Sequence, residues 1–265
     1  MLFLLQLNMN EKIKILFFDL DDTLLRSDKT ISDYTLETLA ECKKRGILIG
    51  FSTSRGQMRN SPYTAQVKPD IIIANGGASV IYDDKLILSE SFTTEETQRL
   101  LSKAYEVCGD TCEITLDTEE SIYWNRDADK STNYAFYAFY NDFKAFPEPA
   151  LKICIQTEDA EKAEKIASCV QDTVLIKFSD IPWYKISSAK GTKENAILFI
   201  SEFLKIPLTE MAAFGDDFSD IGMIKLCGTG VAMGNAIPDV KAAANFIART
   251  NNEDGVAHFI REHYL

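Results

Sequence analysis

The sequence predicts an α/β protein: a doubly wound, Rossmann-like parallel sheet interrupted by an inserted α/β domain. Apolar strand-like runs alternate with helical stretches near both ends of the chain, as in parallel strands joined by crossover helices. Between these regions, hairpin-like segments replace the alternation. We therefore expect a discontinuous core from residues 1–82 and 186–265, and an inserted domain from 83–185.

The first third of the chain predicts three parallel strands. Residues 13–18 are β-branched, aromatic and apolar without an exposed polar face, which is typical of a buried parallel strand. Ser32 then caps a helix that Gly46 ends, and residues 47–52 form the next strand. A short helix leads to the third strand at 70–74.

The middle of the chain predicts the inserted domain. Two strand-like runs flank Asp83-Asp84 and indicate a hairpin, and we place the domain boundary there. Thr94 caps a helix that Gly109 closes. The further elements expected are strands at 112–116, 121–125, 152–156 and 174–178, and a helix at 158–170.

The last third of the chain predicts a return to the core. Residues 183–187 lead to a helix whose buried side carries Ile197 and Ile200, and Pro207 stops it. The elements expected after it are strands at 211–214, 230–233 and 246–248, a helix that begins at Pro238, and a terminal helix.

Composition narrows the class of protein. The 265 residues are 46% hydrophobic, which is ample for a packed core, and 28 basic against 40 acidic residues leave a net charge of −12. That charge repels nucleic acid and anionic membranes, so small molecules are the expected partners. Six scattered cysteines without C-x-x-C spacing predict reduced thiols and a cytoplasmic protein. The oligomeric state is left open.

The opening residues are apolar but too few to span a bilayer, which takes about 20. They have neither a basic leader nor a small-residue cleavage site, so we expect no secretory signal. Met9, followed by Asn-Glu-Lys-Ile-Lys, is a more natural start of the chain. We therefore expect residues 1–8 to be an extension.

Acidic side chains follow two of the predicted strands. Asp19 and Asp21 come directly after the first strand, and Asp216 and Asp220 follow the strand at 211–214. In open α/β sheets the carboxyl ends of the strands border the ligand crevice. Gathered carboxylates repel one another, and a hard divalent cation relieves that repulsion. Oxygen-only ligands with an open position for phosphate suit Mg²⁺.

Other polar groups are expected at the same edge. Thr53, Ser54 and Arg55 follow the second strand, and Asn75 follows the third, in a glycine turn where the backbone can approach a ligand. Lys190 lies in the loop that leads to the helix of the returning chain. Taken singly, each of these residues also has an ordinary structural interpretation, but together they indicate a site.

The motifs Phe-Asp-Leu-Asp-Asp-Thr-Leu-Leu at 18–25, Ala-Phe-Gly-Asp-Asp-Phe-Ser-Asp-Ile-Gly-Met-Ile at 213–224 and Gly-Val-Ala-Met-Gly-Asn-Ala at 230–236 resemble a known family. From about residue 12 to the end, the chain is similar to the Cof-type sugar phosphatases of the haloacid dehalogenase superfamily. The resemblance implies a Mg²⁺-dependent phosphomonoesterase. Its inserted cap would close over small phosphorylated metabolites.

The resemblance also implies residue roles. Asp19 would attack phosphorus to form an aspartyl-phosphate, and Asp21 would act as general acid and then general base. Mg²⁺ would be held by the Asp19 carboxylate, the Asp21 backbone carbonyl and Asp216, with Asp220 a direct or water-mediated ligand. Lys190 would supply a fixed positive charge.

Phosphate or substrate binding is implied for a further set of residues: Thr53, Ser54, Arg55, Asn75, Lys190 and Ser219. Two of them depart from the family pattern, in which glycine usually stands at 54 and asparagine is common at 219. At 219, serine retains a hydrogen-bonding group but has a shorter reach than asparagine.

Two alternatives share parts of this pattern. A sugar-phosphate mutase would form the same aspartyl-phosphate but pass the phosphoryl group to a second sugar hydroxyl. A non-catalytic phospho-aspartate regulatory module also combines acids, a hydroxyl residue and a lysine, but it needs an open face, which an inserted domain of about a hundred residues disfavours. The sequence does not identify the phosphorylated substrate.

Overall fold

The computed structural model describes residues 13–126, 138–178 and 181–265, and only the backbone of residues 57–61; the suggested extension at 1–8 lies outside these ranges. Contacts divide the chain into two compact units. The first unit holds Met1–Gly50, Leu198–Asp216 and Asp220–Leu265, and the second holds Phe51–Ile197 and Asp217–Ser219. No helix in the described ranges combines the length and apolar character needed to cross a membrane.

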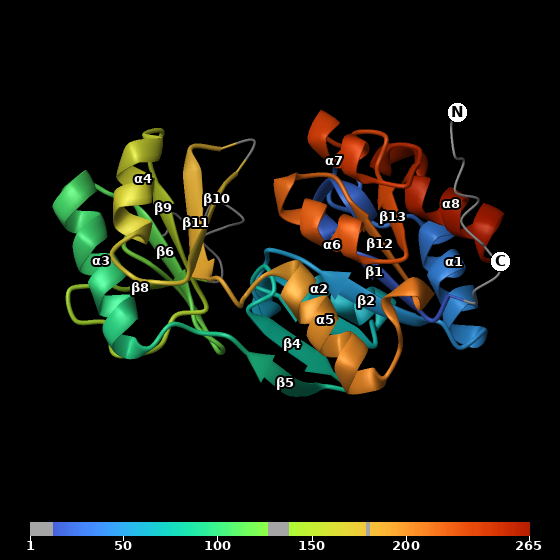
Figure 1. The fold of residues 1–265 in the computed structure, drawn as a ribbon, viewed down its shortest axis with the longest axis horizontal. Helices are drawn as coiled ribbons and strands as arrows, with labels where there is room; N and C mark the ends of the chain where they lie inside the picture. The colour runs from blue at the N-terminus through green and yellow to red at the C-terminus, as the bar shows by residue number, and fades with distance from the viewer. Residues whose placement is uncertain (1–12, 127–137, 179–180) are drawn as a thin grey trace, which may run out of the picture. The chain divides into compact units, whose positions relative to one another are not determined.

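A mixed sheet of eight strands carries the predicted core (Figure 1). Its strands, in spatial order, are β14 (Phe246–Ile247), β13 (Thr229–Ala232), β12 (Met211–Gly215), β1 (Ile15–Phe18), β2 (Leu48–Ser52), β3 (Ile71–Ala74), β4 (Ser79–Tyr82) and β5 (Lys85–Ser89). The pairs from β14 to β1 are parallel, and the pairs from β3 to β5 are antiparallel. The doubly wound α/β class predicted from the sequence is confirmed.

Aromatic packing holds the centre of the first unit together. Phe18 of β1 and Phe214 of β12 are both fully buried, with ring centroids 5.1 Å apart, and the ring of Phe259 packs edge-on against Phe214 at 5.5 Å. Such offset and edge-on contacts are the favourable geometries for aromatic pairs. They fix the carboxyl ends of β1 and β12 next to each other.

The helices follow the predicted pattern with small shifts. Ser32 caps α1 (Asp33–Lys44) and accepts a hydrogen bond from Thr35 N, as expected. The expected cap at Thr94 is wrong by one residue, because Thr93 and Glu96 form a reciprocal capping box that starts α3 at Thr94. The other α-helices described are α2 (Gln57–Val67), α4 (Ala160–Ala167), α5 (Lys193–Leu204), α6 (Ile221–Leu226), α7 (Pro238–Ala243) and α8 (Gly255–His263).

A second sheet of six strands lies in the second unit. Its spatial order is β10 (Thr173–Lys177), β11 (Trp183–Ser188), β9 (Lys152–Gln156), β6 (Ile114–Asp117), β7 (Ile122–Trp124) and β8 (Ala138–Tyr140). One face is apolar and packs against α3 (Thr94–Cys108) and α4, which lie on the same side of the sheet in Figure 1. Because side chains alternate along each strand, the residues between these apolar ones lie on the opposite face of the sheet.

The predicted domain boundaries remain a prediction. The hairpin expected at the start of the inserted domain exists, but its second strand, β5, pairs with β4 at the edge of the first sheet. The compact unit that contains the second sheet begins earlier, at Phe51.

Candidate active site

Asp19 begins a tight turn at the carboxyl end of β1. Its backbone N–H donates to Phe214 O at 3.0 Å, which extends the pairing with β12 by one residue. The turn closes when Leu25 N donates to Leu20 O at 2.8 Å, and Asp22 has a left-handed backbone with φ of 56°. Aspartate tolerates that conformation better than most residues. The apolar strand thus gives way to acidic residues within a single turn.

Three carboxylates converge at this point. Asp19, Asp216 and Asp220 each place one oxygen within 4.8 Å of the others. Asp19 and Asp220 are buried, and Asp216 is half-buried. All three belong to the first unit and come from the ends of β1 and β12 and the short turn that follows β12. The sequence predicted this convergence of residues about two hundred positions apart.

Hydrogen bonds orient two of these carboxylates. The Thr23 hydroxyl donates to Asp216 Oδ1 at 2.7 Å, and the Asp216 backbone N–H donates to Asp220 Oδ2 at 2.9 Å. A carboxylate can accept several hydrogen bonds and still offer lone pairs to a metal. The cluster is rich in oxygen and buried, and repulsion between its charges favours a bound cation. Its residues therefore fit a hard divalent ion such as Mg²⁺.

The Asp21 side chain lies outside this group of three. Its carboxylate is 3.0 Å from Lys29 Nζ, and about two-fifths of the side chain is exposed. Asp21 was predicted to contribute a backbone carbonyl to the metal and a carboxyl group to proton transfer. The exposed ion pair leaves that carboxyl group able to change partners, because such pairs are weak in water.

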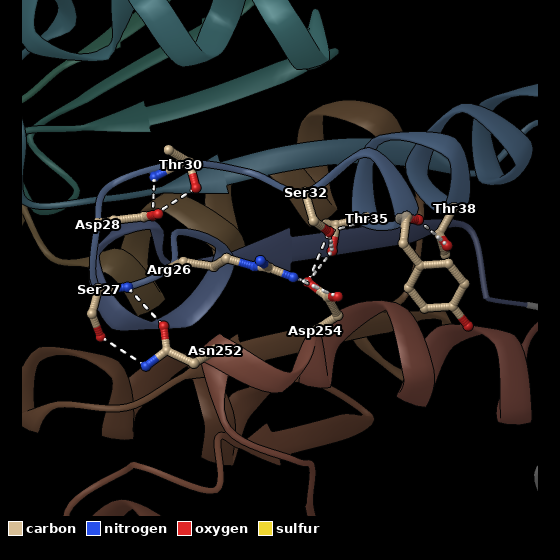
Figure 2. Close-up of polar contacts among 10 residues, drawn as sticks. Arg26, Ser27, Asp28, Thr30, Ser32, Thr35, Thr38, Asn252 and Asp254 are labelled. Atoms are coloured by element: carbon tan, nitrogen blue, oxygen red, sulfur yellow. Dashed lines mark hydrogen bonds and ion pairs between the residues drawn. The ribbon is translucent and has the colours of Figure 1, made fainter.

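A polar network holds the end of the acidic turn that begins at Asp19 (Figure 2). The Arg26 guanidinium donates to both oxygens of Asp254, at 2.9 and 2.8 Å, and the Ser32 hydroxyl donates to Asp254 Oδ1 at 2.7 Å. Burial alone would raise the pKa of Asp254, but the hydrogen bonds from Arg26 and Ser32 outweigh it and hold that pKa below its usual range. The paired arginine and aspartate tie the chain after β1 to the start of α8.

Asn251 and Asn252 continue this support. Asn251 is buried and its amide donates to Leu25 O at 3.0 Å. Figure 2 shows that Asn252 Oδ1 accepts from Ser27 N, at 3.0 Å. The loop before α8 therefore satisfies backbone groups of the loop after β1. Hydrogen bonds from these residues, which are distant in sequence, hold the acidic turn in one conformation.

The second unit carries the remaining predicted residues. Thr53 is buried at the end of β2, where its side chain accepts from Arg55 N at 3.1 Å. Asn75 is buried at the end of β3, with φ of 54°, and Asn75 N donates to Arg55 O at 2.9 Å. Ser54 and Ser219 are partly exposed. The structure thus joins Thr53, Arg55 and Asn75 in two hydrogen-bonded loops.

The two lysines near the start of α5 differ sharply. Lys190, the predicted residue, is exposed, and its backbone N–H donates to the Ser188 hydroxyl. Lys193 is 2% exposed. The sequence held a signal that we missed: Lys193 shares a helix face with Ala196, Ile197 and Ile200, which are all buried. A lysine on the apolar face of a helix is uncommon without a functional or electrostatic reason.

Comparison of the sequence with known proteins identifies the family of this chain. The sequence model of the family described as haloacid dehalogenase-like hydrolases matches residues 16–260. The chain is 30% identical over 270 residues to the 5-amino-6-(5-phospho-D-ribitylamino)uracil phosphatase YitU of Bacillus subtilis, covering 97% of this chain and 99% of that protein. It is 29% identical over 287 residues to the phosphatase YwpJ of the same organism, with 94% and 99% covered.

The fold agrees with solved structures. The phosphatase BT1666 from Bacteroides thetaiotaomicron, of the same enzyme superfamily, has a TM-score of 0.84 at 22% identity, with 96% of each chain covered. The predicted family resemblance and the predicted phosphatase class are confirmed. The acidic motifs after β1 and β12 thus lie within a match that covers nearly the whole sequence, and the chain belongs to the haloacid dehalogenase-like hydrolases.

Proposed function

We propose that this protein is a Mg²⁺-dependent phosphomonoesterase that acts on small phosphorylated metabolites. The observation that carries the proposal is the convergence of Asp19, Asp216 and Asp220 within 4.8 Å at the ends of two strands. These three carboxylates, with the Asp21 backbone carbonyl, would hold the metal. When bound, Mg²⁺ would neutralise charge on the phosphate oxygens.

The proposed reaction has two steps. An Asp19 carboxylate oxygen attacks phosphorus, the bond from phosphorus to the substrate oxygen breaks, and Asp21 protonates the departing alcohol. A water molecule then attacks the aspartyl-phosphate, Asp21 takes its proton, and inorganic phosphate leaves with Asp19 regenerated. A single carboxyl group at Asp21 thus serves as acid and then as base.

The proposed phosphate-binding groups come from the second unit. Thr53 would donate its hydroxyl, and Ser54, Arg55, Asn75 and Ser219 remain candidates for contacts with phosphate or substrate. Lys190 is the phosphate-binding lysine predicted from the sequence, but the burial of Lys193 favours Lys193 for this role. A fixed ammonium in a water-poor site stabilises developing charge more strongly than a solvated one.

A matched pair of variants separates the two lysines. Lys193→Met should lower kcat by at least about 100-fold, since removal of one electrostatic donor from an active site has that effect. Lys190→Met should stay within about threefold of the wild type. The reverse order would restore Lys190 as the phosphate-binding lysine.

The substrate class follows from charge and from relatives. A net charge of −12 disfavours nucleic acid, and we propose a cytoplasmic enzyme acting on small phosphate esters. One relative is a 5-amino-6-(5-phospho-D-ribitylamino)uracil phosphatase, and a solved structure with a similar fold is a sugar phosphatase. Phosphorylated sugars and polyols are accordingly the proposed substrates.

A panel of phosphorylated sugars and polyols, assayed with Mg²⁺ and with EDTA, tests the proposal. We expect inorganic phosphate from at least one member, only with Mg²⁺. A phosphorylated isomer without phosphate release would favour the mutase, and a stable phospho-Asp19 would favour the regulatory module. Independently of turnover, Mg²⁺ should raise the Tm of the wild type but not of Asp220→Asn, which removes a buried member of the carboxylate cluster.

A further inference from the structure

The second sheet has an unusual charged face. Asp117 of β6 pairs directly with Lys152 of β9, and Lys152 pairs with Ser187 of β11, two residues from Lys185. Because opposite residues and alternate residues in a strand share a face, Asp117, Lys152 and Lys185 all lie on one side of the sheet. The apolar residues that face α3 and α4 alternate with them. We call these three residues the charged face.

The charged face lies against the two loops that carry Thr53 and Asn75. Lys152 Nζ donates to Ser54 O at 2.6 Å. A Cβ atom on Gly56 would lie 2.6 Å from Asp117 Oδ2, and one on Gly76 would clash directly with the Lys185 ammonium. Only glycine leaves room for these side chains. All of these residues belong to the second unit, so the charged face and both loops form one compact body.

The charges of this face do not balance. Lys152 is 5% exposed and has Asp117 Oδ2 at 3.2 Å, but Lys185 is 2% exposed and its ammonium makes no hydrogen bond or ion pair with any residue that the structure describes. Burial above all, and then the charges of Lys152 and Lys193, lower the pKa of Lys185 to about 8. A buried ammonium without a counter-charge is costly, so such groups normally have a partner.

Neighbouring polar atoms are also unsatisfied. Among the described residues, Asn75 Oδ1 and Ser187 Oγ are buried without a hydrogen-bond partner. Ser187 shares the charged face with Lys185, and Asn75 precedes Gly76, against which the Lys185 ammonium lies. Buried polar groups in native proteins are nearly always satisfied by protein, water or ligand. The Lys185 ammonium and the Ser187 hydroxyl can donate hydrogen bonds to an anion. Asn75 Oδ1 can accept a hydrogen bond from a hydroxyl group of the same ligand.

We propose that Lys185, supported by Lys152 and the hydroxyl of Ser187, binds a second acidic group of the substrate, a carboxylate or a further phosphate on the part that departs as the alcohol. The inference rests on the proposed phosphomonoesterase function and narrows its substrate class: among phosphorylated sugars, polyols and the acids derived from them, those with a second acidic group are preferred over neutral ones. Asp117 positions Lys152 and leaves the charge of Lys185 for the ligand.

Substrate pairs that differ only in the second acidic group test this inference. Suitable pairs are ω-phosphorylated aldonic acids against the matching phosphorylated alditols, with four to six carbons, and fructose 1,6-bisphosphate against fructose 6-phosphate. The wild type should prefer the acidic member of at least one pair by about tenfold or more in kcat/KM, mainly through KM, because a charge-assisted hydrogen bond contributes that much. Absence of a preference in every pair would overturn the proposal.

Three variants identify the residue responsible. Lys185→Met, which keeps the unbranched chain but removes the charged terminal group, should bring the preference down to about threefold or less while leaving p-nitrophenyl phosphate turnover within about threefold. Lys185→Arg should keep most of the preference, and the exposed control Lys144→Met should keep it fully. A loss of p-nitrophenyl phosphate turnover equal to the loss for acids would mean that Lys185 binds the transferring phosphate instead.

A binding measurement separates this inference from the proposed function. Calorimetry with the phosphate-free aldonates and alditols needs no catalysis. The wild type should bind an aldonate and no alditol, and Lys185→Met should bind neither. If no phosphate ester is hydrolysed, the proposed function fails, but aldonate binding would still support an acid-binding site at Lys185. Equal aldonate binding by the wild type and Lys185→Met would reject that site.

Discussion

The two compact units each bury like charges but treat them differently. In the first unit, Asp19, Asp216 and Asp220 gather at strand ends, and a threonine hydroxyl and a backbone N–H donate to two of them. In the second unit, Lys185 is buried beside two other lysines and has no partner among the residues described. The first arrangement suits a cation, and the proposed role of the second is to bind an anion. A bound metal and an acidic substrate would neutralise them in turn.

The largest expected effect comes from Asp19. Asp19→Asn keeps the shape of the side chain but removes the nucleophilic charge, so turnover should fall by about 10⁴-fold or more. The Tm without metal should hold or rise, because one of three repelling carboxylates is neutralised. The control Asp110→Asn changes an exposed acid and should leave both quantities unchanged. Retained turnover in Asp19→Asn would end the assignment of the acidic cluster as the reaction centre.

The support of the acidic turn gives the next effect. Asp254→Asn should lower the free energy of unfolding by about 2 kcal/mol at pH 7, since it weakens charge-assisted hydrogen bonds from Arg26 and Ser32. The pKa of Asp254 is depressed in the folded protein, so its stabilisation is complete above the ordinary pKa of 3.8 and is lost as the pH falls through the folded value. Denaturant unfolding of both proteins between pH 7 and pH 3 measures this, and a pH-independent difference would contradict it.

A pair of glycines sharpens the description of the charged face. Gly76 and Gly46 have similar positive φ values, 74° and 80°, but only a Cβ on Gly76 would meet Lys185, while nothing lies within 4 Å of one on Gly46. Gly46→Ala should cost about 1 kcal/mol from backbone strain alone. Gly76→Ala should cost at least about 1 kcal/mol more. Adding Lys185→Ala to Gly76→Ala should recover much of that excess; if it does not, the ammonium does not lie against Gly76.

The smallest effect is a change in the pH dependence of stability. The pKa of Lys185 is lowered to about 8 from an ordinary 10.5, so between these values the unfolded state binds the additional proton. The contribution of Lys185 to the free energy of unfolding should therefore rise with pH from about 8 to about 10.5, in the direction opposite to that of the buried cysteines Cys42, Cys112 and Cys227, whose pKa values are raised. Lys185→Met should remove this rise and be the more stable protein at pH 7, whereas the exposed control Lys190→Met should keep the rise. Equal slopes in all three proteins would mean that folding does not lower the pKa of Lys185.

The candidate site was partly predictable from sequence. Asp19 and Asp216 directly follow apolar strands, and the ends of β1 and β12 meet because those strands are neighbours in a parallel sheet. Such acids can be recognised in the sequence because charged residues interrupt an apolar pattern that is typical of a buried strand. Lys193 was overlooked for the opposite reason: a lysine near a helix start has a common solvated interpretation, and Lys190 matched the expected loop. Burial separated the two lysines, and burial depends on what packs against the helix.

The domain pattern shows a similar division. Alternation of strands and helices predicted the α/β class, but a hairpin has the same local signature in either sheet, so only the structure shows that β5 pairs with β4. The charged face was not anticipated at all. Asp117, Lys152 and Lys185 are separated by dozens of residues and lie in strands with ordinary alternation, so nothing local distinguishes them from solvent-exposed positions.

By itself, the sequence determined the α/β class, the acidic turns after two strands and the family, because each depends on residues close together in the chain. Only the tertiary structure decided which lysines lose their water, which loop supports the acidic turn and what the charged face of the second sheet lies against. Those properties arise from desolvation and from contacts between distant segments. Local patterns cannot encode them, since the energy of a buried charge depends on all of its neighbours in space.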